Sequence, residues 1–181
     1  MQFFTKQLWH RAQNDLDNRS EWQRAFEQHA AQLENLRDRV DPDAFLFFAG
    51  NDLHDGELIE LSVIDGSRPA PPTSPIRPWL SPRDHPVKVV LTAIDAYEKF
   101  AWQLSYEKVR RIQVDYPSDT QLFHSEGEGF GDWGYQELTD ASSGFLRHEI
   151  LFATGATLVF EFKSVNLRRT ARPNPADADT E

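Results

Sequence analysis

The spacing of apolar residues near the start of the chain predicts helices. Between residues 22 and 40, large apolar side chains recur every three or four positions, which places them on one face of a helix. Ser20 and Gln23 form a capping-box pattern that begins this helix, and Asp41-Pro42 ends it and opens a short second helix. Upstream, Thr5 is the expected N-cap of another short helix. The apolar positions of the long helix are Trp22, Phe26, Ala30, Leu33, Leu36 and Val40.

After residue 50 the apolar residues alternate with polar ones, and this period of two indicates β-strands. Seven prolines between residues 68 and 86 exclude a helix or a central strand, so an extended loop is predicted there. Short connections favour antiparallel neighbours, because a parallel return needs a crossover of roughly a dozen residues. The predicted strands cover Ile59–Val63, Val87–Ile94, Phe100–Tyr106, Arg110–Tyr116, Trp133–Leu138, Phe145–Phe152 and Thr157–Lys163, and the last two form a hairpin.

These elements predict a single α+β domain over residues 1–167, with N-terminal helices packed on a largely antiparallel sheet of about six to seven strands. The 181 residues of the chain are enough for a substantial single core. Separate helical and strand domains would each leave an apolar face exposed. Residues 168–181 are polar and contain two prolines, so we predict a disordered C-terminal tail.

The composition narrows the compartment and the kinds of partner. The chain has no cysteine, which excludes a disulfide framework, a thiolate nucleophile and a cysteine-ligated metal, and which fits a reducing cytoplasm. It contains no run of about eighteen apolar residues, so no membrane association is expected. The formal net charge of −10 repels a phosphate backbone, so nucleic acid is not an expected partner. We therefore expect a cytoplasmic protein.

Acidic residues gather in two stretches, 51–66 and 115–140, neither of which contains a lysine or an arginine. If the fold brings the stretches together, they form a field that steers a basic protein partner, with nearby rings as anchors. The alternatives are an ordinary solubilising surface and rings that belong to the core. The candidate binding residues are Asp55, Glu57, Asp119, Glu126, Glu128, Phe130, Asp132, Trp133 and Tyr135.

No motif in the chain specifies a reaction or a cofactor. The loop at residues 125–131 is rich in glycine but has no basic residue to hold a phosphate, and no Gly-x-Ser-x-Gly elbow occurs. One alternative is a metal-assisted hydrolase, in which His54, Asp55 and His124 are the metal ligands. Another is a structural subunit whose acidic face docks in a larger assembly. The leading interpretation is a protein-binding module without catalytic residues.

Short motifs in the chain resemble those of small bacterial α+β proteins of unknown function. The first motif is His54-Asp55-Gly56 before the first strand. The second is the stretch Gly131–Glu137, which contains a Trp-x-Tyr-x-Glu pattern, and the third is the closing hairpin His148–Phe162. A similar layout occurs among immunity proteins of bacterial toxin systems, which are typically acidic and bind a cognate toxin. The resemblance covers roughly residues 1–167, implies protein binding and carries no catalytic residue.

Overall fold

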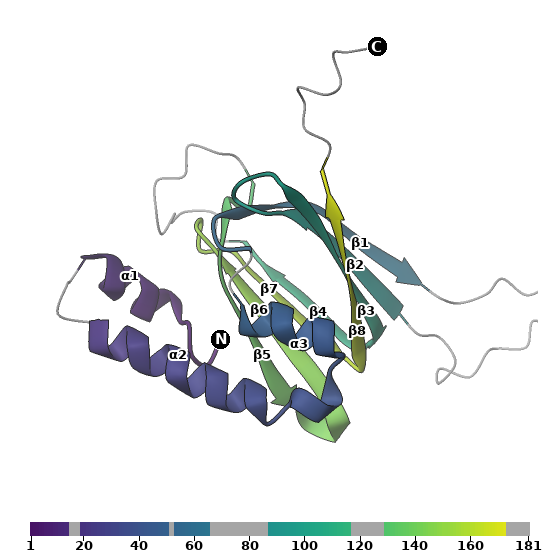
Figure 1. The fold of residues 1–181 in the computed structure, drawn as a ribbon, viewed down its shortest axis with the longest axis horizontal. Helices are drawn as coiled ribbons and strands as arrows, with labels where there is room; N and C mark the ends of the chain where they lie inside the picture. Colours follow the sequence, from purple (N-terminus) through teal and green to yellow (C-terminus); the bar gives the residue numbers. More distant parts are fainter. Residues whose placement is uncertain (15–18, 51–52, 66–86, 117–128, 173–181) are drawn as a thin grey trace, which may run out of the picture.

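Three helices precede an antiparallel sheet and pack against it (Figure 1). The computed structural model describes residues 1–14, 19–50, 53–65, 87–116 and 129–172. The helices are α1 (Lys6–Asn14), α2 (Arg19–Glu34) and α3 (Pro42–Ala49). The strands are β1 (Gly56–Asp65), β2 (Val87–Ile94), β3 (Phe100–Val109), β4 (Arg111–Asp115), β5 (Asp132–Ala141), β6 (Phe145–Phe152), β7 (Thr157–Phe162) and β8 (Ser164–Ala171). The predicted α+β class with N-terminal helices is confirmed.

Two of the three predicted helix starts have the capping residue that the sequence indicated. The Thr5 hydroxyl accepts the Leu8 N–H at 3.1 Å, and the Asp41 carboxylate accepts the Asp43 N–H at 3.0 Å. The long helix differs at both ends, because α2 already includes Ser20 and ends at Glu34, before a single 3₁₀ turn. Its apolar spacing continues through that turn, so periodicity alone overestimated its length.

The described residues contain eight strands where about six to seven were predicted. The additional strand is β8, which covers the first residues of the predicted disordered tail. As the outer partner of β3, β8 exposes one side to solvent and has a polar sequence, which explains why composition indicated a tail. Its Arg169 guanidinium lies 3.5 Å from the centre of the Phe100 ring and so holds the strand to β3. Residues 173–181 lie outside the described residues.

Strands β3 and β4 follow one bent path and do not form the antiparallel pair that their short connection predicted. β3 pairs with β2 and β8, whereas β4 pairs with β7. At the bend Lys108 adopts a left-handed φ of 53°, and the pairing passes from β8, where Glu107 is opposite Ser164, to β7, where Arg111 is opposite Glu161. Because β7 and β8 turn the same corner, the sheet folds over on itself, with strand order β4-β7-β6-β5-β1-β2-β3-β8.

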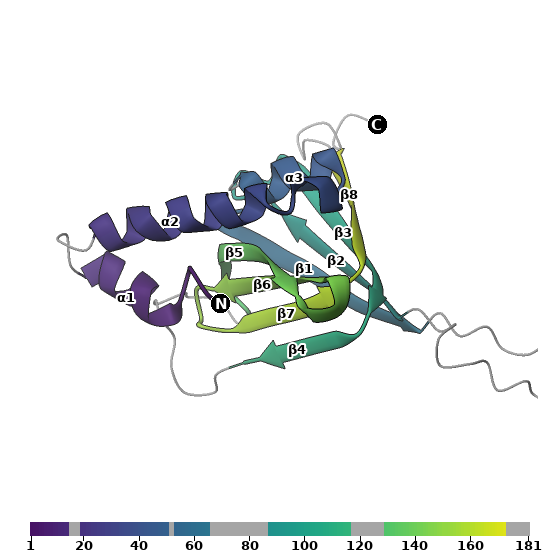
Figure 2. The ribbon, with the colours of Figure 1, turned by 90° about the horizontal axis from the view of Figure 1, so that it is seen from below.

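Two apolar cores lie on opposite faces of β5 and β6. The helices α1 and α2 lie along one side of these strands (Figure 2). The first core lies between the folded halves of the sheet and α3, and it includes Trp133, Ile150 and Phe152. The second includes Tyr135 and Leu151 and packs against α1 and α2. Side chains alternate along a strand, so β5 between two cores is buried on both faces. The N-terminal part contributes Phe3, Phe4, Leu8, Trp9 and Ala25 to the second core.

Candidate functional site

The first candidate site is the place where β1 meets β5, because three of the predicted binding carboxylates lie together there. The turn before β1 is held by a hydrogen bond from the Asp55 N–H to the Trp133 carbonyl, 2.8 Å long. Glu57 follows and lies directly opposite Asp132 in the β1–β5 ladder. We call Asp55, Glu57 and Asp132 the acidic junction. The two acidic stretches of the sequence therefore do meet at this rim.

The carboxylates of the acidic junction are exposed, and the Asp55 side chain keeps 71% of its surface. In the described part of the chain no lysine or arginine pairs with them, and their one ion-pair contact joins Asp55 to His54 Nδ1 at 3.5 Å. Like charges directly opposite each other on paired strands are destabilising. The ladder therefore places Glu57 and Asp132, two like charges, opposite each other without a described basic partner.

The aromatic residues predicted for the binding surface belong largely to the cores. Trp133 is 1% exposed and Tyr135 9% exposed, so neither is an exposed anchor. Phe130 is half-buried, with its ring centre 5.0 Å from that of Phe152. Burial, and to a lesser extent the charge of Asp55, raises the pKa of Tyr135 to about 12, so its hydroxyl stays protonated at neutral pH. Among the described members of the predicted set, the exposed side chains are those of Asp55, Glu57 and Asp132.

One exposed ring close to the acidic junction was not singled out by sequence reasoning. Tyr97 lies in the turn between β2 and β3 and is 79% exposed. This turn follows Ile94, the β2 residue that pairs with Glu57. The Lys99 ammonium lies 5.4 Å from the centre of the Tyr97 ring. An alternating strand pattern gives no reason to select a turn tyrosine, and only the pairing of β1 with β2 brings it to this rim.

Two of the three ligands predicted for a metal are neighbours in the turn before β1. His54 Nδ1 also faces the Trp133 carbonyl at 3.5 Å, and its ring centre lies 4.9 Å from that of Tyr135. Among the described residues, no group of three or more His, Asp or Glu side chains is placed to hold a metal ion. His54 and Asp55 therefore supply at most a partial set. Outside the described residues lie His124, Asp119, Glu126 and Glu128.

Gly56 fixes the backbone of the acidic junction because there is no room for a side chain. A Cβ atom added at Gly56 would overlap the carbonyl oxygen of Ile94 and would lie 2.9 Å from the carbonyl oxygen of Leu53. Both are backbone atoms of packed elements, so we expect Gly56→Ala to lower the free energy of unfolding by about 1–3 kcal/mol in urea titration. Gly129→Ala is the control, since an added Cβ there meets nothing within 4 Å and only the backbone conformation costs about 1 kcal/mol. Equal losses in the two variants would contradict this account.

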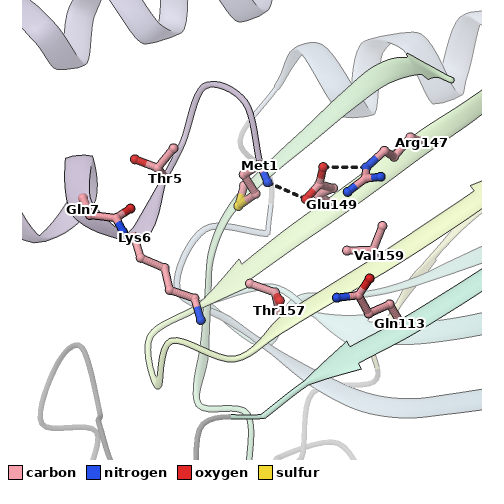
Figure 3. A pocket seen from close by; sticks show the side chains of 9 residues that line it. All are labelled: Met1, Thr5, Lys6, Gln7, Gln113, Arg147, Glu149, Thr157 and Val159. Atoms are coloured by element: carbon pink, nitrogen blue, oxygen red, sulfur yellow. Dashed lines mark hydrogen bonds and ion pairs between the residues drawn. The ribbon is translucent and has the colours of Figure 1, made fainter.

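The second candidate site is a pocket of about 330 Å³ between the N-terminal segment and the sheet (Figure 3). It is lined by both charged and polar side chains from the N-terminal segment, β4, β6 and β7. The Met1 amine lies 2.5 Å from Glu149, whose other oxygen accepts a hydrogen bond from Arg147 at 2.6 Å. The lining residues are Met1, Thr5, Lys6, Gln7, Gln113, Arg147, Glu149, Thr157 and Val159.

The charges in this pocket neutralise one another. Burial opposes ionisation of Glu149, but the hydrogen bonds from Arg147 and the Met1 amine outweigh it, so the pKa of Glu149 lies below its usual range. Arg147 also approaches Glu161 at 3.4 Å, and Lys6 approaches Asp115 at 3.7 Å. The lining contains no histidine to act as a general base. The pocket therefore orders the N-terminal segment, and the acidic junction is the stronger candidate for a site.

Comparison with known proteins gives no relative: no protein-family model, curated protein or solved structure matches the chain. The resemblance to immunity proteins thus stays a prediction. The function proposed below rests on the geometry of this chain, because no relative supplies one.

None of the described helices has the length and apolar character needed to cross a bilayer.

Proposed function

We propose that this protein is a non-enzymatic binding protein that holds a basic partner protein at the acidic junction, as an immunity-type neutraliser of a toxin would. One observation carries the proposal: Asp55, Glu57 and Asp132 share one rim, exposed and without a lysine or arginine partner among the described residues. Carboxylates in such an array attract and orient a cationic surface. The repulsion between Glu57 and Asp132 falls when that surface binds.

Tyr97 supplies the apolar part of the proposed interface. Binding energy in protein interfaces is concentrated in a few residues, and tyrosine is prominent among them. At 79% exposure its ring has most of its surface left to bury. The proposed interface therefore combines three carboxylates for charge with one aromatic anchor, and Trp133 and Tyr135 support it from the core.

The proposal is tested by site-specific photo-crosslinking in extract from the native cells at low salt. A photoreactive residue replaces Glu57 in one variant and Glu27 in another, because Glu27 is an exposed carboxylate on α2 that contacts Gln23 and forms no ion pair with a described residue. We expect a discrete adduct from position 57 that disappears in 1 M salt, since that concentration shortens the screening length to about 3 Å. Identical adduct patterns from both positions, or none from position 57, would refute the proposal.

Charge reversal provides the quantitative prediction. Once the adduct identifies the partner, we expect Glu57→Lys to weaken its binding about tenfold or more, a change of roughly 1.4 kcal/mol, because a repulsive contact replaces an attractive one. Glu27→Lys changes the net charge equally and is expected to alter the affinity less than about twofold. Isothermal titration calorimetry measures both. A comparable loss in the two variants would mean that net charge, and not the acidic junction, governs binding.

A further inference from the structure

Strand β1 has an unpaired edge over most of its length, although it is an inner strand in the order of the sheet. It pairs with β2 from Glu57 to Asp65, but with β5 only at Gly56 and Glu57. Strand β5 begins at Asp132, opposite Glu57, and runs away from the rest of β1 (Figures 1 and 2). From Leu58 to Ile64, no described strand pairs with the edge of β1 that lies away from β2.

This edge carries apolar side chains that the fold leaves in solvent. Ile59 is 56% exposed, Val63 57% and Ile64 46%. Val63 lies opposite Val89, which is fully buried. The Val63 side chain therefore lies on the same face of the sheet as the core, but at a position that the core does not cover. An incoming strand would cover Val63 and extend that face, because paired strands lie about 4.8 Å apart.

The other two edges of the sheet have protection that β1 lacks. Natural edge strands are blunted by short length or by basic side chains. Strand β4 has five residues and begins with Arg111. Strand β8 carries Arg168 and Arg169. In contrast, β1 contains no lysine or arginine. Its protection is the carboxylates of Glu57 and Glu60, which repel an acidic strand but not a basic one, and a bulge between Leu58 and Glu60, after which the register with β2 is regular.

We propose that the β1 edge from Leu58 to Ile64 accepts an extended basic segment of the partner protein as an added strand, an inference that rests on the proposed function above. Main-chain hydrogen bonds hold such a segment, and alternate side chains give it specificity. Its charge follows from its neighbours: Glu57 and Glu60 are exposed, and neither forms an ion pair with a described lysine or arginine. Lys88, opposite Ile64, is already paired with Glu107 at 3.0 Å.

A second copy of the chain fits this edge poorly. Two β1 strands in an antiparallel pair would bring the Glu57 and Glu60 carboxylates of both copies into one ladder, where like charges repel. The formal net charge of −10 on each chain opposes the same association. A segment in which lysine or arginine alternates with apolar residues satisfies both the carboxylates and Val63.

The test uses a synthetic peptide of alternating lysine and valine as the probe. We expect it to slow amide hydrogen exchange at residues 61–64 at least tenfold, and not along β4 or β8. A peptide N-methylated at alternate residues, which cannot complete the hydrogen-bond ladder, should lose the effect. Val63→Lys should weaken peptide binding at least tenfold, whereas Val114→Lys, at a valine of matched exposure on β4, should leave it within twofold.

Each other outcome overturns strand addition in a recognisable way. If Glu57→Lys weakens peptide binding but Val63→Lys and N-methylation do not, the acidic junction binds without an added strand, and the proposed function stands. If light scattering shows a dimer and β1 is protected without peptide, the occupant is a second copy. If the peptide fails to bind, strand addition is refuted, and crosslinking from position 57 decides the proposed function separately.

Discussion

Replacing Glu137 with alanine is expected to lower the free energy of unfolding by about 3–5 kcal/mol, the range for breaking a buried charged network. The Glu137 side chain is fully buried and accepts backbone hydrogen bonds from Gln2, from Phe3 at 2.9 Å and from Phe4 at 3.3 Å. Its Oε1 also lies 3.9 Å from the Met1 amine. Without the carboxylate these donors are left buried and unpaired, or Phe3 and Phe4 leave the second core.

Urea unfolding followed by tryptophan fluorescence measures this loss, since Trp9 and Trp22 pack in or against the second core. Glu137→Gln is expected to lower the free energy of unfolding by less than Glu137→Ala, because its side-chain carbonyl oxygen still accepts one of these hydrogen bonds. Some loss remains, because its NH2 group cannot accept the others. Glu27→Ala, on the exposed face of α2, should change the stability by less than about 0.5 kcal/mol. A loss below about 1 kcal/mol for Glu137→Ala would show that the carboxylate does not anchor the N-terminal segment.

Acidification from pH 7 to pH 5 is expected to cost about 4 kcal/mol of stability, half of it from His148 and half from His29. Burial, with a smaller effect of the neighbouring His29, lowers the pKa of His148 to about 3, and burial lowers that of His29 to about 4. Both histidines stay neutral in the folded protein, whereas in the unfolded chain they bind a proton below about pH 6.5. The contribution of these two neutral histidines to stability is therefore fully present above about pH 6.5. It is lost as the pH falls toward the folded-state pKa values of about 4 for His29 and about 3 for His148.

The contacts of His148 explain why it cannot accept a proton in place. Its Nδ1 lies 2.7 Å from the Tyr106 hydroxyl and its Nε2 lies 3.2 Å from Gln136 Oε1. These partners satisfy a neutral ring, in which one nitrogen accepts and the other donates. Burial also raises the pKa of Tyr106 well above its ordinary value, so the hydroxyl remains a donor. A cation here would have no compensating charge.

Thermal or urea unfolding at a series of pH values measures the slope. His148→Gln is expected to lower the stability at pH 7 yet to reduce the loss between pH 7 and pH 5 to about 2 kcal/mol, because one titrating group is gone. His54→Gln removes a half-exposed histidine and should keep the loss near 4 kcal/mol. Carboxylates titrate mostly below this range. If His148→Gln still loses about 4 kcal/mol between pH 7 and pH 5, the burial of a neutral His148 ring does not cause the pH dependence of stability.

The helices and most strands could be predicted because their causes are local. The Asp41-Pro42 pair caps and begins α3, and the hairpin of β6 and β7 forms across residues 153–156, as predicted. The bend at Lys108 could not be predicted, since it depends on the strands that lie beside it. The same holds for β8, whose polar sequence becomes a strand only because β3 offers it an edge.

The candidate site was predicted in part, and the division follows from what each kind of residue requires. Carboxylates without a buried partner stay at the surface, so charge indicated Asp55, Glu57 and Asp132, whereas it gave no sign that Glu137 is buried. Rings contribute to either a core or a surface, and period-two alternation does not distinguish the two when both faces of a strand are covered. Trp133 and Tyr135 are buried for this reason.

By itself the sequence determined the class of the fold, the caps at Thr5 and Asp41, the hairpin and the acidic character, because each arises from neighbours along the chain. Tertiary structure alone decided which strands pair, that β5 has a core on each side, and that β5 meets β1 only at Gly56 and Glu57. These features depend on contacts between residues far apart in sequence, which no local period encodes. The open edge of β1 and its carboxylates are such a product of pairing.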